Sequence, residues 1–196
     1  MFEDDKRNTL KKLKHAIENN LVDKEVMYIV DKINELNNYY TTSSCIGRCG
    51  IMEFPKNKNT KIYSRWLGKW HHYAEYNEIF EALDKKSEDF EYLVFVMNSP
   101  ILHIASKDIH SAKKLLELAI HNGLKASSIK SVNDRRVIVE ILPTYKVDAP
   151  IGADGKVFVN DDYLKFLLDI GNKKLKEARK RLRVLHERLD SLQDKY

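Results

Sequence analysis

The stretch KDIHSAKKLLELAIHNGLKASSIKSVNDRRVIVEIL, residues 107–142, determines the fold class that we predict. Its first part predicts an amphipathic helix over 107–122, because apolar residues recur at helical spacing and Gly123 stands where a helix commonly ends. Its last part predicts two strands, 127–132 and 137–142, joined by a polar turn. A helix followed by an antiparallel hairpin is typical of a fold that mixes helices and strands.

The segments before this stretch show the same mixture. Residues 46–54 and 61–72 are strand-like and flank a loop at 55–59, which predicts a second hairpin. Apolar residues recur three and four apart within 2–38, which predicts two helices there. The remaining predictions are a helix at 76–86, strands at 92–97 and 101–105, and short strand-like pieces within 147–159.

A long final helix is predicted from a cap at Asn160 or Asp161 to about Leu192. One face is apolar in a heptad-like pattern, and the other is basic. Two interpretations stay open: the helix packs through its leucines and is otherwise solvated, or its basic face follows nucleic-acid phosphates. The apolar face consists of Leu175, Ala178, Leu182, Leu185, Leu189 and Leu192, and the basic face of Lys173, Lys174, Lys176, Arg179, Lys180, Arg181, Arg183 and Arg188.

Length and composition predict one domain. The chain has 196 residues, of which 43% are hydrophobic, enough for one substantial core. We therefore predict a single α+β (layered α/β) domain over residues 1–196, with a mainly antiparallel or mixed sheet, flanking helices and a long basic C-terminal helix. A Rossmann-type fold is not predicted, because no glycine-rich dinucleotide motif joins a strand to a helix.

Charge, hydropathy and cysteine content narrow the function classes. The formal net charge of +5 is compatible with nucleic acid but does not establish it. No apolar run is long enough to cross a bilayer, so we expect no membrane association. Cys45 and Cys49 have no second pair of cysteines, which argues against a disulfide framework or a zinc site, and we predict no metal. The expected compartment is reducing, most simply the cytoplasm.

Residues 39–48, YYTTSSCIGR, combine four short hydroxyls with a thiol, a glycine and an arginine. The hydroxyls can bond a polar ligand, Gly47 lets a ligand approach the backbone, and Arg48 can grip an anion. The alternative is a turn whose side chains bond the backbone, with Arg48 in a structural ion pair. On the first interpretation the binding residues are Thr41, Ser43, Ser44, Cys45, Gly47 and Arg48.

Two histidines are candidate catalytic residues. His103 lies in the middle of the predicted strand 101–105, and alternation directs it away from its apolar neighbours, so a polar partner or a cleft is expected beside it. A hydrogen-bonded structural histidine is the competing interpretation. His71 follows Trp66 and Trp70 at a strand end, where these rings could stack on bases, although the tryptophans could equally be core anchors.

Tyr-Thr-Thr-Ser-Ser-Cys-Ile-Gly-Arg at 40–48 resembles the signature Ser-x-Ser-Ser-Cys-x-Gly-Arg of the wybutosine-synthesis methyltransferase family. That family comprises the third wybutosine-synthesising protein of eukaryotes and its archaeal counterparts. The resemblance covers nearly the whole chain in order. Two departures are Thr41, where serine is frequent, and Ser99, where an acidic residue is expected. The further matches are Trp66-Leu67, His71, 100–104, 119–127, Pro150, 163–168 and Asn172.

The resemblance implies an S-adenosylmethionine-dependent enzyme outside the Rossmann-type architecture. It would methylate N4 of the tricyclic 7-(3-amino-3-carboxypropyl)-4-demethylwyosine-type base at position 37, in the anticodon loop of phenylalanine tRNA. His103 would accept the proton, with His71 as second choice, because imidazole titrates near neutral pH.

We assign hypothetical roles to the binding residues from their chemistry. Ser43 and Ser44 would bond a polar group of a ligand. Arg48 would hold a carboxylate, of the methyl donor or of the base, or else a phosphate. Asn172 would join this binding set, and Cys45 would be a buried packing thiol beside it.

Two hypotheses from other classes stay open. One is a non-catalytic tRNA-binding module that grips phosphate through the hydroxyl-rich segment, and the other is an oligomeric scaffold paired through the leucines of the last helix. A monomer and a weak dimer are both compatible with the sequence. The enzymatic interpretation predicts that residues 43–48 and His103 converge on one pocket.

Overall fold

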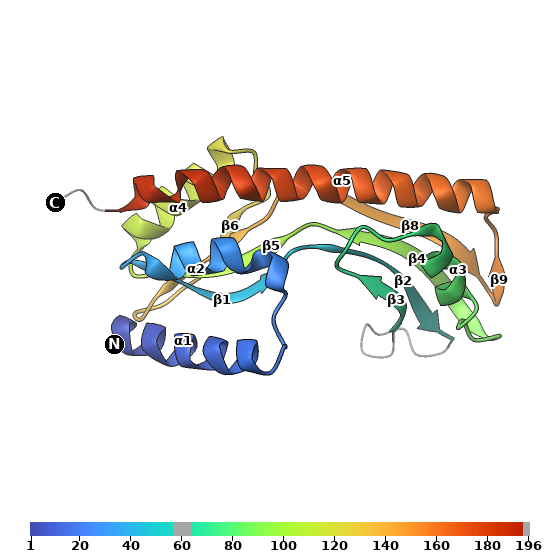
Figure 1. Ribbon diagram of the computed structural model, residues 1–196, viewed down its shortest axis with the longest axis horizontal. Helices are drawn as coiled ribbons and strands as arrows, with labels where there is room; N and C mark the ends of the chain where they lie inside the picture. Colours follow the sequence, from blue (N-terminus) through green and yellow to red (C-terminus); the bar gives the residue numbers. More distant parts are fainter. Residues whose placement is uncertain (57–63, 194–196) are drawn as a thin grey trace. The chain divides into compact units, whose positions relative to one another are not determined.

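Figure 1 shows a computed structural model of the chain, in which residues 1–56 and 64–193 are described. Contacts sort the chain into two compact units, each built on one antiparallel sheet. The predicted α+β class is therefore confirmed, whereas the single domain over 1–196 stays a prediction. The first unit comprises Met1–Ile46, Pro100–Thr144 and Ala178–Tyr196, and the second comprises Gly47–Ser99 and Tyr145–Glu177.

The first unit contains a four-stranded sheet of order β1-β5-β7-β6. Both elements of the stretch 107–142 form as predicted, a helix that ends just before Gly123 and an antiparallel hairpin. The strands are β1 (Tyr39–Cys45), β5 (Ile101–Ser106), β6 (Ser128–Val132) and β7 (Val137–Ile141), and the helices are α1 (Phe2–Glu18), η1 (Lys24–Val26), α2 (Met27–Glu35) and α4 (Ile109–His121).

The core of this unit lies on one face of the sheet. Apolar residues of α2, α4 and the end of α5 pack there against Leu102 and Ile104 of β5. The α1 helix lies on the opposite face (Figure 1), where Phe2 packs against Tyr40 and Ala105. The leucine-packing interpretation of the last helix is confirmed in this unit, because Leu182, Leu185, Leu189 and Leu192 are core residues.

Two sequence expectations need correction in this unit. Residues 39–45, for which a turn was one of the two interpretations, form the strand β1 instead, in which Tyr39 and Tyr40 are both buried. Tyrosine and threonine favour strands, but the run of polar residues hid the alternation. Arg179, assigned to the basic face of the last helix, is buried, where its Nη1 donates to Glu25 and its Nε to the carbonyl of Ile46.

The second unit contains a five-stranded sheet of order β3-β2-β4-β8-β9. Its β2–β3 hairpin confirms the predicted one, although the loop residues 57–59 and the first residues of the predicted second strand, 61–63, lie outside the described residues. Asn160 begins the last helix, because its Oδ1 accepts the amide of Tyr163 at 3.0 Å. The elements are β2 (Arg48–Pro55), β3 (Arg65–Trp70), β4 (Phe90–Asn98), β8 (Lys146–Ala153), β9 (Lys156–Val157), α3 (Tyr76–Leu83) and, up to Glu177, α5 (Asp161–Arg188), which η2 (Leu189–Leu192) follows in the first unit.

One face of this second sheet packs against α5. A Cβ at Gly171 would lie 2.9 Å from the ring of Phe95 and 3.3 Å from the sulfur of Cys49, so the helix approaches the strands closely. Because side chains alternate along a strand, Cys49 and Ile51 of β2 face the helix, and Arg48 and Met52 face the opposite side. No helix among the described residues is both long and apolar enough to cross a membrane.

Glu53 anchors the end of β2 through a buried carboxylate. Arg65 Nε and the amide of Ser87 each donate to it at 2.7 Å, and the residue is only 3% exposed. Burial opposes the charged form, but the hydrogen bonds from Arg65 and Ser87 outweigh it and hold the pKa of Glu53 below its usual 4.5.

Glu53→Gln is therefore expected to lower the free energy of unfolding at neutral pH by about 2 kcal/mol. Since the pKa is lower in the folded state, the ionised group stabilises above the unfolded-state pKa, and this contribution disappears as pH falls through the folded value. Urea unfolding at pH of about 7 and about 3 should show a smaller difference at acid pH. The exposed Glu81→Gln serves as the control, and an equal loss at both pH values would contradict the argument.

Candidate active site

Three polar side chains form a row across the open part of the first sheet. Ser43 of β1 is the register partner of His103 of β5, which is in turn the partner of Glu140 of β7, so the three share one face. Ser43 Oγ lies 2.8 Å from His103 Nδ1, and His103 Nε2 lies 3.0 Å from Glu140 Oε2. The polar partner predicted for His103 is confirmed.

A β-bulge places Ser43 in this row. The register shifts between Thr41 and Ser43, so Thr42 is the extra residue and Ser43 lies opposite His103. The hydroxyl of Thr42 donates to the backbone carbonyl of His103 at 3.1 Å, which ties the bulged strand to its neighbour. Lys130 of β6 lies 2.7 Å from Glu140 Oε1, so both oxygens of this carboxylate have partners.

The contacts of His103 define what the row can do. An ionised carboxylate only accepts hydrogen bonds, so we assign the ring proton to Nε2, which donates to Glu140. Nδ1 is then an acceptor for the hydroxyl of Ser43. The side chain of His103 is 31% exposed and that of Glu140 11%, which leaves Ser43 at the solvent side. Such a row can take up a proton from a group bound at Ser43.

The other residues of the hydroxyl-rich segment divide between the two faces of β1. Thr41 is buried on the helix-covered face, where its amide and hydroxyl both donate to Asn34 Oδ1. Ser44, the register partner of the buried Leu102, points the same way. Of the predicted binding residues in β1, Ser43 and Cys45 share the face of His103.

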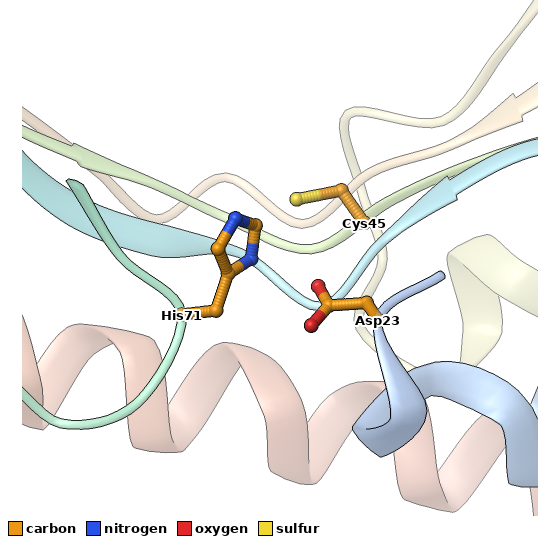
Figure 2. A group of neighbouring side chains, drawn as sticks. All are labelled: Asp23, Cys45 and His71. Atoms are coloured by element: carbon orange, nitrogen blue, oxygen red, sulfur yellow. The ribbon is translucent and has the colours of Figure 1, made fainter. Parts of the chain in front are cut away.

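Cys45 was predicted to be a buried thiol, but it is half-buried, and Cys49 is the buried cysteine. The strand end that carries Cys45 is held by Asp23, whose carboxylate accepts the amide of Ile46 at 3.2 Å. The sulfur of Cys45 and a carboxylate oxygen of Asp23 lie within 4.8 Å of one another. Figure 2 draws both side chains.

Arg48 belongs to the second unit and has an unusual environment there. Its guanidinium carbon lies 5.2 Å from the centroid of the Trp66 ring, a cation–π distance. No hydrogen bond or ion pair joins the Arg48 guanidinium to another residue of the described part of the chain, and its buried Nε is left without a partner. The structural ion pair that was the alternative for Arg48 is therefore not seen among residues 1–56 and 64–193. Gly47 before it has a φ of +84°, a conformation that favours glycine.

His71 and Asn172 also lie in the second unit. His71 is half-buried and directly follows the end of β3 at Trp70, as predicted. Asn172 of α5 donates its Nδ2 to the carbonyl of Ala74 at 2.9 Å and so anchors the segment that follows His71. Its Oδ1 is buried and, among residues 1–56 and 64–193, has no hydrogen-bond partner.

Ser43 and His103 are in contact in the first unit, and Arg48 lines a pocket of the second unit. The single pocket predicted for residues 43–48 and His103 stays a prediction. Sequence reasoning missed Glu140, Lys130 and Trp66 as partners of the candidate residues. Glu140 lies in an otherwise apolar strand, and only the register of β5 and β7 places it beside His103.

Comparisons with known proteins match nearly the whole chain. The family described as Methyltransferase TYW3 matches residues 4–191. A protein of Methanocaldococcus jannaschii named tRNA(Phe) 7-((3-amino-3-carboxypropyl)-4-demethylwyosine(37)-N(4))-methyltransferase is 68% identical over 191 residues, which cover 97% of this chain and 98% of the relative. The protein of the same name from Thermococcus sibiricus is 39% identical, over 97% of this chain and 95% of the relative.

Solved structures also match this chain over most of its length. The PH1069 protein of Pyrococcus horikoshii superposes with a TM-score of 0.89 at 37% identity, over 96% of this chain and 95% of that one. A hypothetical protein of Aeropyrum pernix superposes with a TM-score of 0.75 at 28% identity, over 87% of this chain and 98% of that one. The match over nearly the whole length, in sequence and in fold, shows that this chain belongs to the TYW3 methyltransferase family.

Proposed function

We propose that this protein methylates N4 of the 7-(3-amino-3-carboxypropyl)-4-demethylwyosine base at position 37 of phenylalanine tRNA. The name shared by relatives up to 68% identical supports this reaction over a non-catalytic tRNA-binding role. The proposal includes S-adenosylmethionine as the methyl donor, the anticodon loop as the part of the tRNA that is bound, and the cytoplasm as the compartment.

The Ser43–His103–Glu140 row is the observation that carries the mechanism. When bound, S-adenosylmethionine supplies a methyl group on a sulfonium sulfur, whose C–S bond breaks as the N4–C bond forms, leaving a thioether. The proton lost from N4 passes to Ser43 Oγ as Ser43 gives its own proton to His103 Nδ1, over the 2.8 Å contact between them. Glu140 then stabilises the imidazolium ion through its contact with Nε2.

Incubation of the purified protein with S-adenosylmethionine and phenylalanine tRNA that carries the demethylated base tests the reaction. We expect mass analysis of nucleoside 37 to show the gain of one methyl group, and the gain to depend on the donor. An unchanged nucleoside, with tRNA binding that weakens steeply with salt, would favour the non-catalytic tRNA-binding module instead.

Glu140→Gln is expected to slow methyl transfer by about tenfold, because a neutral amide no longer stabilises the imidazolium ion. It should also change the pH profile of kcat and leave the KM for tRNA unchanged. Glu117→Gln, on the neighbouring helix α4, is the matched control. Equal pH profiles for the Glu140→Gln variant and the wild type would show that Glu140 does not act through His103.

A further inference from the structure

The second sheet carries a pocket on the face opposite α5. Its volume is about 440 Å³, within the usual range of small-molecule sites. Apolar side chains of four strands form most of its surface, and Arg48, Asn98 and Asp148 are its polar groups. All of these residues belong to the second unit.

Trp66 forms a rigid wall of this pocket because Gly50 lies beneath it. A Cβ on Gly50 would lie 2.6 Å from the Trp66 ring and 2.6 Å from the carbonyl of Gly68, so only glycine leaves room for the indole. Arg48 stacks on the ring from the same strand as Gly50. The aromatic surface is thus already in place and can stack on a flat ring.

The polar groups of the pocket are of opposite charge. Arg48 is a cation whose buried Nε is unpaired within the described ranges, an arrangement that a hydrogen-bond acceptor in the pocket would relieve. Asp148 of β8 is an anion with a half-exposed side chain, and its partner is Lys146 on the same strand. An exposed ion pair of this kind contributes little free energy, so a ligand cation can compete with Lys146.

We propose that this pocket binds an α-amino-acid group attached to a flat heterocycle. Arg48 pairs with the carboxylate, Asp148 with the ammonium group, and Trp66 stacks on the heterocycle. This inference rests on the proposed function, in which two molecules have that chemistry. The donor carries it on its sulfonium sulfur, and the base carries it as its 3-amino-3-carboxypropyl side chain.

Calorimetry in the absence of tRNA tests whether the amino-acid group in the pocket is that of the methyl donor. The probes are S-adenosylhomocysteine and 5′-methylthioadenosine, which shares the nucleoside but lacks the amino-acid group. If the donor occupies the pocket, Arg48→Gln and Asp148→Asn each lower the affinity for S-adenosylhomocysteine about tenfold or more and leave the affinity for methylthioadenosine unchanged. Trp66→Ala lowers the affinity for both probes. Arg48→Lys should recover part of the loss.

Methyl-transfer kinetics test whether the amino-acid group in the pocket is the side chain of the base. The substrates are phenylalanine tRNA with and without the aminocarboxypropyl group on the base at position 37. If the base occupies the pocket, Arg48→Gln leaves both calorimetric affinities unchanged and reduces the preference for the side-chain-bearing tRNA about tenfold. Lys69→Gln, an exposed basic residue of β3, is the control variant and should behave as the wild type.

Either of these two results supports binding of an amino-acid group in the pocket and identifies the molecule that carries it. The inference is overturned if Arg48→Gln, Asp148→Asn and Trp66→Ala change neither probe affinity nor tRNA preference. Failure of the proposed function looks different, since the wild-type protein would then transfer no methyl group to either tRNA, while the calorimetric comparison still reports on the pocket.

Discussion

His103→Ala is expected to slow methyl transfer by about 10²- to 10⁴-fold, the usual contribution of a general base. Without the imidazole, the hydroxyl of Ser43 has no acceptor at 2.8 Å for its proton, and Glu140 has no ring to stabilise. Single-turnover measurement with saturating donor and tRNA isolates the chemical step. Because the side chain is partly exposed, we expect donor affinity and the unfolding midpoint to change little.

Ser43→Ala should have a smaller effect in the same assay, since a water molecule can replace the hydroxyl as a relay. His110→Ala, an exposed histidine of α4, is the matched control and should retain full activity. Methyl transfer by the His103→Ala variant at the wild-type rate would remove the row from the mechanism and leave His71 as the candidate base.

Arg179→Met is expected to lower the free energy of unfolding by about 3 kcal/mol. The arginine side chain is 7% exposed, and its Nη1 lies 3.0 Å from Glu25 Oε2. Its Nε donates to the carbonyl of Ile46 at 3.1 Å. Methionine fills a similar volume, so the loss reports mainly on the carbonyl left without this donor.

Equilibrium unfolding in urea measures this difference, with Lys180→Met as the control for removing one positive charge from the same helix. Lys180 is exposed, so its replacement should change stability by less than about 0.5 kcal/mol. If both variants lose the same stability, Arg179 acts as an ordinary surface cation, as the sequence pattern suggested.

Local patterns were sufficient for most of the architecture. Helix α4 and the β6–β7 hairpin follow from periodicity and turn residues within the stretch 107–142, because their backbone hydrogen bonds join residues close in sequence. Strand β1 was missed, since hydroxyl residues carry little hydrophobic periodicity.

Local patterns predicted only part of the candidate site. Alternation alone indicated that His103 needs a polar partner, and the hydroxyl-rich chemistry of residues 39–48 indicated Ser43 and Arg48. The identity of Glu140 as the second partner depends on strand pairing across residues far apart in sequence.

The sequence by itself determined the helices, the hairpins, the direction of His103 and the family to which the chain belongs, because each depends on neighbouring residues or on an ordered set of motifs. Only the tertiary structure decided that a bulge brings Ser43 opposite His103, that Arg179 is buried, and that Gly50 makes room for Trp66. These features depend on strand register and on close packing between segments distant in the chain, which no local pattern of residues encodes.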